Sequence, residues 1–327
     1  MIDRLPSPTA VKGREGTRIG RYWLHDCLGH ASHTAVYSAS TPSGEWCALK
    51  LVDRRLQGAE NLVDRVLHEA DVIDRIGNPY ILPILNAVAA DDMTAVVMPF
   101  VDGLTLRDLM RSGRLDPDDA WTYMSQIAES LRSAHLWGLS YKVLKPANIL
   151  VRDGRAYLAE FGVTGRSAGK VGLAAPDCQL SGAQYLAPEQ ILGAEPDHRT
   201  DIYALAVLAF ELATATPLYQ GDRSSAILAA ALNGVPPSAH ARNPSVPPDV
   251  DGVLRRALST DPQCRHGSVD ELIGELVSPP ASYGDDGGAV GGEPVPPAEH
   301  ASGPVTVDSL IDVLSGLLAP DAADIDA

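Results

Sequence analysis

Apolar and polar positions follow two different periods along the chain. Between residues 21 and 101, short apolar runs separated by polar turns predict strands. Residues 62–76 are the exception, because their apolar side chains recur at a helical spacing with charges between them. After Asp102-Gly103 the helical period prevails. The pattern therefore predicts a small β-rich part with one helix, followed by a larger helical part.

The individual elements can be assigned to residue ranges. Strands are expected at 22–24, 35–39 and 46–51, with two more between 81 and 98. Helices are expected at 62–76, 106–111, 117–137, 201–214, 223–232, 248–258 and 269–277. Together these elements form one folded region between residues 20 and 278.

The two ends of the chain differ in composition from its middle. Residues 1–19 mix Pro, Gly, Ser and charge without apolar periodicity, so we expect them to be disordered. Residues 279–304 are rich in Pro, Gly and acid, which is typical of a linker. Within 305–327 we expect an amphipathic helix at 305–318 and an acidic tail. A helix this short is marginal alone, so it would dock on this chain or on a partner, or else stay disordered.

Composition and charge narrow the class of protein. A length of 327 residues with 45% apolar side chains accommodates one large two-lobed domain or two small ones. The four cysteines stand singly, which argues against disulfides and a zinc site. The formal net charge of −16 argues against binding to nucleic acid or anionic lipid. Because no apolar window could span a membrane and no signal peptide is evident, we expect a cytoplasmic protein.

One stretch carries a recognisable motif. It runs from Tyr141 to Val151 and is followed by Glu160-Phe161-Gly162. It resembles the catalytic loop and metal-binding turn of the eukaryotic-type Ser/Thr protein kinases found in bacteria, which read His-Arg-Asp-Leu-Lys-Pro-x-Asn and Asp-Phe-Gly. The resemblance implies an α+β, two-lobed protein-kinase-like fold over residues 20–278. Its small β-rich N-lobe with one helix would cover 20–101, and its larger helical C-lobe 102–278.

The positions that carry the chemistry of that family are changed. Tyr141 stands for its His and Lys142 for its Arg, while Val143 replaces the catalytic Asp and Glu160 the metal-binding Asp. Val143 has no lone pair to accept a proton, and a positioned base contributes roughly 10²–10⁴ in rate. The charge-neutralising Lys145 is retained.

The resemblance also implies a nucleotide site. Of the three glycines in the family's phosphate loop only Gly29 remains. Lys50 matches the lysine that holds the phosphates, and Glu69 matches its ion-pair partner. Adenine would contact backbone groups of Pro99 and Val101, beside Met98, and would lie between Val36, Ala48 and Leu150. Asn148 and Glu160 are the candidate metal ligands. We therefore expect binding of ATP or ADP with Mg²⁺ to be weak or absent.

Matches beyond the catalytic loop concern the scaffold. Ala187-Pro188-Glu189 matches the family's Ala-Pro-Glu, and the resemblance implies that Glu189 pairs with Arg265. Asp201 matches the residue that anchors the catalytic loop. Gly182 replaces the family's peptide-positioning Thr. Three hydroxyl residues, which an active kinase could phosphorylate or which are ordinary loop residues, are Thr164, Ser167 and Ser181.

These features favour a pseudokinase. In this interpretation the chain is a catalytically impaired signalling scaffold that binds protein partners, such as an active kinase or a phosphopeptide-binding module. Nucleotide occupancy and phosphorylation are its candidate switches. The alternative is a divergent but active ATP-dependent Ser/Thr phosphotransferase or nucleotidyl-transferring enzyme. A third interpretation is a sensor for a ligand other than ATP. Neither nucleic acid nor membrane insertion is expected.

Overall fold

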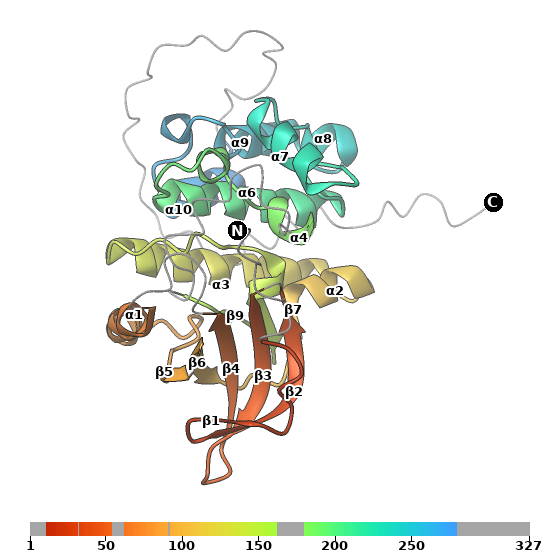
Figure 1. Cartoon of the computed structure of the whole chain (residues 1–327). Coiled ribbons are helices and arrows are strands. Elements are labelled where there is room, and N and C mark those ends of the chain that lie inside the picture. The colour runs from red at the N-terminus through yellow and green to blue at the C-terminus, as the bar shows by residue number, and fades with distance from the viewer. Residues whose placement is uncertain (1–10, 32, 54–61, 91, 162–179, 280–327) are drawn as a thin grey trace, which may run out of the picture.

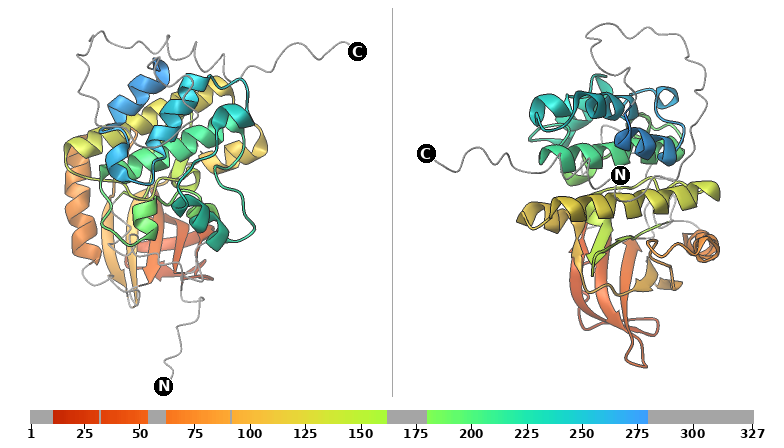
Figure 2. Two further views of the ribbon diagram at one scale, coloured as in Figure 1. Left: turned by 90° about the horizontal axis from the view of Figure 1, so that it is seen from above. Right: turned by 180° about the vertical axis from the view of Figure 1, so that it is seen from behind.

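The computed structural model describes residues 11–31, 33–53, 62–90, 92–161 and 180–279. They form two lobes, one built around an antiparallel sheet and one built from helices (Figure 1). Helix α3 (Pro117–Leu136) runs between the sheet and the other helices of the large lobe, as the view from behind also shows (Figure 2). The predicted two-lobed α+β fold is confirmed.

The small lobe contains a six-stranded sheet. Its strands in spatial order are β1 (Arg18–Ile19), β2 (Tyr22–His30), β3 (Thr34–Ser40), β4 (Trp46–Asp53), β6 (Met93–Pro99) and β5 (Asn86–Ala90). All neighbouring pairs are antiparallel. In β4 and β6 nearly every side chain is buried, because one sheet face covers a hydrophobic core and the other faces α1 and the large lobe.

The N-terminal segment belongs to this lobe. Val11 is buried in the sheet's hydrophobic core, and its carbonyl oxygen accepts a hydrogen bond of 2.9 Å from the Tyr37 hydroxyl. Strand β1 follows at Arg18. The disorder expected for residues 1–19 is therefore wrong for residues 11–19, where buried side chains are too few to produce a periodic signal. Residues 1–10 lie outside the described part.

Helix α1 (Leu62–Ile76) is the one helix among the described residues of the small lobe. Its buried side chains Leu62, Val66 and Ile73 recur at a helical spacing, which is the period that predicted it. Leu62 and Val66 share a hydrophobic cluster with Val96 of β6 and Ala87 of β5. This packing fixes α1 against the cleft-facing side of the sheet.

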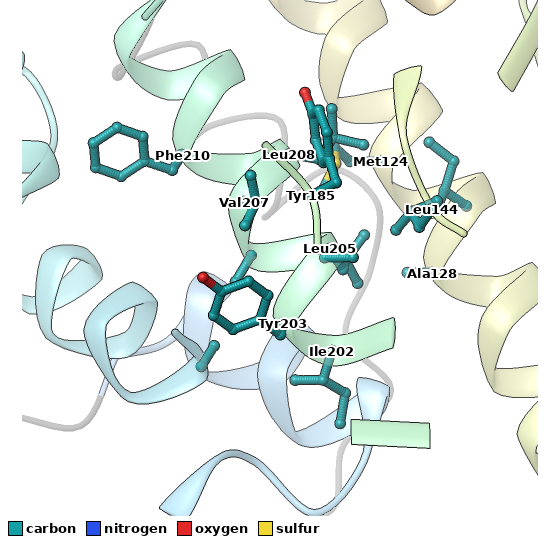
Figure 3. Close-up of a cluster of buried hydrophobic side chains, with 14 of the residues drawn as sticks. Met124, Ala128, Leu144, Tyr185, Ile202, Tyr203, Leu205, Val207, Leu208 and Phe210 are labelled. Atoms are coloured by element: carbon teal, nitrogen blue, oxygen red, sulfur yellow. The ribbon is translucent and has the colours of Figure 1, made fainter. Parts of the chain in front are cut away.

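The large lobe is organised around α6 (His198–Thr214), in which 13 of 17 residues are buried. A helix that is apolar on all sides belongs in the centre of a core. Side chains of α6 meet Met124 and Ala128 of α3, together with Leu144 and Tyr185 (Figure 3). The remaining elements are β7 (Leu104–Thr105), α2 (Leu106–Ser112), β8 (Ile149–Arg152), β9 (Arg155–Leu158), α4 (Leu180–Ala183), α5 (Pro188–Ile191), α7 (Ser224–Leu232), α8 (Ala239–Arg242), α9 (Pro248–Ala257) and α10 (Val269–Val277).

Helix termini carry the sequence signals that define them. Thr105 caps α2 through a capping box with Asp108, and Asp116 and Asp197 cap α3 and α6.

No helix in the described ranges combines the length and apolar character that crossing a membrane requires.

Candidate functional site

A cleft of about 350 Å³ lies between the lobes. The predicted positions that line it are Gly29, Val36, Ala48, Met98, Pro99, Val101, Asn148, Leu150 and Glu160. Val36 and Ala48 reach it from β3 and β4, and Leu150 reaches it from β8 on the opposite lobe. The structure thus brings together side chains from both lobes as the resemblance implied for a purine slot.

The segment between the lobes forms the back wall of this cleft. Strand β6 ends at Pro99, and the Gly103 N–H donates a 3.0 Å hydrogen bond to the Val101 carbonyl. Gly103 lies so close to β8 that an added Cβ would be 2.3 Å from the Val151 carbonyl oxygen. Gly103 was not predicted as a site residue, although the Asp102-Gly103 turn marks the point in the sequence where the period changes.

Lys50 makes an ion pair at the inner end of the cleft. Its Nζ lies 2.7 Å from Oε2 of Glu160, and the two side chains are only 7% and 17% exposed. Burial works against the charged carboxylate, but the Lys50 ammonium outweighs it, and the pKa of Glu160 is lowered. The cation expected to hold phosphates is therefore neutralised by this chain's own carboxylate.

The expected pairing of Lys50 with Glu69 is wrong in this structure. Glu69 instead lines a second cavity of about 270 Å³, together with Lys142 and Phe161. Burial raises the pKa of Glu69, while Arg65 and Lys142 act in the opposite direction. The physical reason is the placement of α1, which puts the Glu69 carboxylate beside Lys142 of the catalytic loop. Lys50 therefore pairs with Glu160 instead.

Asp201 of α6 holds the catalytic loop in shape. Its carboxylate is fully buried and accepts hydrogen bonds from the backbone N–H groups of Tyr141 (2.7 Å) and Lys142 (2.5 Å). His135 Nε2 lies 2.8 Å from the same carboxylate, and Gln190 Nε2 donates to the Lys142 carbonyl at 2.9 Å. The predicted anchoring role of Asp201 is confirmed. His135 and Gln190 were missed, because neither has a local sequence signal.

The backbone of this region is strained at two points. Lys142 and Glu160 have φ values of 69° and 70°, although neither is a glycine. Such left-handed conformations cost of the order of 1–3 kcal/mol each and persist only where the surroundings impose them. The fold therefore retains the shape of a catalytic loop and turn.

Val143 occupies the position of the catalytic base without its chemistry. Its side chain is half-buried against the core of the large lobe, and its carbonyl oxygen accepts a 3.1 Å hydrogen bond from Asn148 Nδ2. An isopropyl group has no lone pair with which to accept a proton. Lys145 contributes positive charge near Glu160, whose pKa it helps to lower.

Tyr141 and Phe161 pack as core residues, as predicted. Their ring centroids are 4.8 Å apart at a tilt of 55°, and both side chains are buried. The Tyr141 hydroxyl donates to the Ala159 carbonyl. Burial, together with the negative charge of Glu160, raises the pKa of Tyr141 well above its ordinary value. This hydroxyl is therefore a structural donor.

The residues present do not fit a catalytic magnesium site well. Magnesium requires near-octahedral oxygen ligands. Asn148 can offer one amide oxygen, and Glu160 is engaged by Lys50. The purine end of the cleft is lined as the resemblance implied, whereas the carboxylate at the metal position is held by Lys50.

The scaffold downstream of the catalytic loop is intact. Arg265 makes two hydrogen bonds to Glu189, of 2.8 and 2.7 Å, which confirms the predicted pair. Such bidentate pairs fix geometry as well as charge. The side chains of Thr164, Ser167 and Ser181 lie outside the described residues, as does the segment 305–318.

Comparison with known proteins identifies the class. The protein kinase domain family matches residues 22–275. The chain is 31% identical to Serine/threonine-protein kinase PknH of Mycobacterium bovis, over 80% of this chain and 44% of that protein. It is 34% identical to Serine/threonine-protein kinase PknD of Mycobacterium tuberculosis, over 79% of this chain and 39% of that protein.

A solved structure agrees with these sequence matches. The crystal structure of the Mycobacterium tuberculosis PknI kinase domain superimposes with a TM-score of 0.62 at 27% identity, covering 80% of this chain and 97% of that one. The chain spans about two fifths of the length of the curated relatives that it matches. It belongs to the protein kinase domain family, and its relatives are bacterial Ser/Thr kinases.

Proposed function

We propose that this chain is a catalytically impaired, protein-kinase-like regulator that acts by binding protein partners. The observation that carries the proposal is Val143, an apolar side chain at the position where this family needs a base. The Lys50–Glu160 ion pair supports it, since it occupies both the phosphate-binding cation and the remaining metal-binding carboxylate. Nucleotide occupancy and phosphorylation are the proposed switches, and the cytosol is the proposed compartment.

The intact scaffold is consistent with this role. Asp201, Gln190 and the Glu189–Arg265 pair keep the surfaces around the cleft in a kinase-like arrangement. These contacts do not involve the side chains at the positions that carry catalysis, so a loss of catalytic activity would leave them in place. A partner that recognises the shape of a kinase domain, such as an active kinase, could therefore still bind.

A transfer assay tests the proposal. The purified chain would be incubated with ATP labelled at the γ- or α-phosphate, with and without Mg²⁺, beside Lys50→Ala and the exposed-lysine control Lys12→Ala. We expect no incorporation of label into the chain or into an added protein acceptor. Incorporation that Lys50→Ala abolishes and Lys12→Ala preserves would overturn it.

The second candidate is a divergent active ATP-dependent Ser/Thr phosphotransferase or a nucleotidyl-transferring enzyme. The lining of the purine slot favours it, since side chains from both lobes converge there and the relatives are Ser/Thr kinases. In such an enzyme Lys50 would have to leave Glu160 to reach a phosphate. The two labels in the same assay separate these outcomes, because a phosphotransferase moves only the γ label and a nucleotidyl transferase moves the α label.

A further inference from the structure

Four aromatic side chains, of which Phe100 lines the cleft, extend from it along the edge of the small lobe. They are Trp23 of β2, His25 of β2, Trp46 of β4 and Phe100, and we call them the aromatic shelf. The His25 and Trp46 rings lie 4.8 Å apart, and the Trp46 and Phe100 rings 5.9 Å apart. Trp23 is 49% exposed and Trp46 56% exposed.

The strand register places the shelf on the same sheet face as the cleft. Val36 lines the cleft, and Ser40 lies four residues further along β3 in an unbroken pairing with β4, so both side chains point the same way. Ser40 pairs with Trp23 on one side and with Trp46 on the other. The shelf is thus a continuation of the cleft ceiling towards solvent.

The geometry of the shelf is fixed rather than incidental. His25 Nε2 lies 2.9 Å from the Ser40 hydroxyl, which orients the imidazole against Trp46. Strands lie about 4.8 Å apart, so the two indoles stand roughly 10 Å apart at the backbone with the small Ser40 between them. Exposed tryptophans grouped in this way are typical of interaction surfaces.

The charges near the shelf indicate what would cover it. Asp102 and Asp108 line the cleft together with Phe100, and the exposed Asp26 and Glu45 lie next to His25 and Trp46 in the sequence. The nearby Arg21 places its guanidinium over the ring of Tyr22, 5.3 Å from its centroid. Residues 279–327 contain nine acidic residues and no Lys or Arg, and a second copy also carries a net charge of −16. Both would be repelled by these carboxylates.

We propose that the aromatic shelf docks an arginine-bearing segment of another protein. A guanidinium is planar and weakly hydrated, so it stacks on indole faces, while the carboxylates of Asp102 and Asp108 beside Phe100 attract its charge. This proposal rests on the proposed partner-binding function, for which the aromatic shelf would be the surface and arginine the group that it recognises. It does not depend on loss of catalysis, since a chain that transfers phosphate could still bind here.

A peptide of alternating glycine and arginine, blocked at both ends, tests the proposal on the full-length protein. It has no hydroxyl group and so cannot serve as a phosphate acceptor. Titration calorimetry should show saturable binding that weakens about tenfold in Trp46→Ala and in Trp23→Ala. Trp137→Ala, which removes a similarly exposed tryptophan from the other lobe, should bind like the wild type. A matched peptide with citrulline in place of arginine should bind at least tenfold more weakly.

Results of three kinds would overturn the proposal. The first is no saturable binding of the arginine peptide by the wild type. The second is an equal loss in the Trp137→Ala variant, or equal binding of the citrulline peptide. The third is a wild-type dimer, measured by light scattering, that Trp46→Ala converts to a monomer, because a second copy would then cover the shelf. Trp46→Phe keeps a ring and should recover part of the binding. Circular dichroism confirms that each variant is folded.

Discussion

At the scale of single residues, Glu160 decides what this cleft can hold. Its carboxylate lies on Lys50 at 2.7 Å, in surroundings where both side chains are largely buried. The family resemblance located both residues in the cleft region, but it assigned Lys50 to the wrong carboxylate.

Glu160→Gln tests the strength of this ion pair. Removing one partner of a buried pair leaves the other charge uncompensated, so the free energy of unfolding should fall by about 3 kcal/mol. Urea denaturation followed by circular dichroism measures this change. Glu45→Gln, at an exposed position, should change it by less than about 0.5 kcal/mol. Equal stability of Glu160→Gln and the wild type would show that the pair contributes no net stability.

Gly103→Ala tests the close approach between the lobe connection and β8. The added Cβ would clash with the Val151 carbonyl oxygen at 2.3 Å, so the backbone must move. We expect a loss of about 1–3 kcal/mol in the free energy of unfolding. Gly274→Ala is the matched control, because its Cβ meets nothing within 4 Å and alanine favours helix α10 by about 1 kcal/mol. A Gly103→Ala variant as stable as the wild type would contradict the close approach.

At the scale of elements, periodicity predicted the helices of seven or more residues well and the four-residue helices not at all. Helices α3 and α10 were predicted to within one residue, and α6 begins only three residues earlier than expected. The four-residue helices α4, α5 and α8 span barely one turn, so no period can reveal them.

The sequence predicted those parts of the candidate site whose positions are fixed by local motifs. Most purine-slot positions were found through the family resemblance, and the anchoring by Asp201 followed with them. The partner of Lys50 could not be found this way, because it depends on how α1 packs against the large lobe. That is a tertiary property with no local signal.

The contact between α9 and α10 predicts a pH dependence. His266 is fully buried, with Nε2 3.0 Å from Glu275, and its Nδ1 finds no hydrogen-bond partner within the described ranges. Burial and the charge of Arg256 lower its pKa. The unfolded chain therefore takes up a proton first as the pH falls through about 6.5. Stability should fall from that pH downwards.

His266→Gln should remove this dependence. Its free energy of unfolding, measured in urea between pH 5.5 and pH 8, should decline less steeply towards acid than that of the wild type. His30→Gln, at an exposed position, should keep the wild-type slope. Glu271, whose pKa is also lowered despite burial, acts in the same direction only near pH 4.5 and below. Parallel curves for His266→Gln and the wild type would contradict the assignment to His266.

At the scale of the whole molecule, ligand binding in the cleft should be visible as thermal stabilisation. Because the purine slot is lined from both lobes and the Lys50 charge is neutralised, adenosine and ATP should stabilise the protein similarly, with little effect of Mg²⁺. At a hundredfold excess over the dissociation constant the gain is about 2.7 kcal/mol, or about 5–10 °C in a domain of this size. Ala48→Leu, which fills the slot, should abolish the shift. A larger shift with ATP and Mg²⁺ would contradict the site described here.

The purine slot is open, whereas the lysine expected to hold the phosphates is paired with Glu160, and this difference has a pharmacological consequence. In an active kinase, an inhibitor that occupies the slot must displace abundant cellular ATP, which lowers its apparent affinity. Here Lys50 is held by Glu160, so the triphosphate adds little to the binding of the ring. A flat heteroaromatic compound would then meet little competition. We therefore expect the binding of such a compound to this protein to depend little on the ATP concentration.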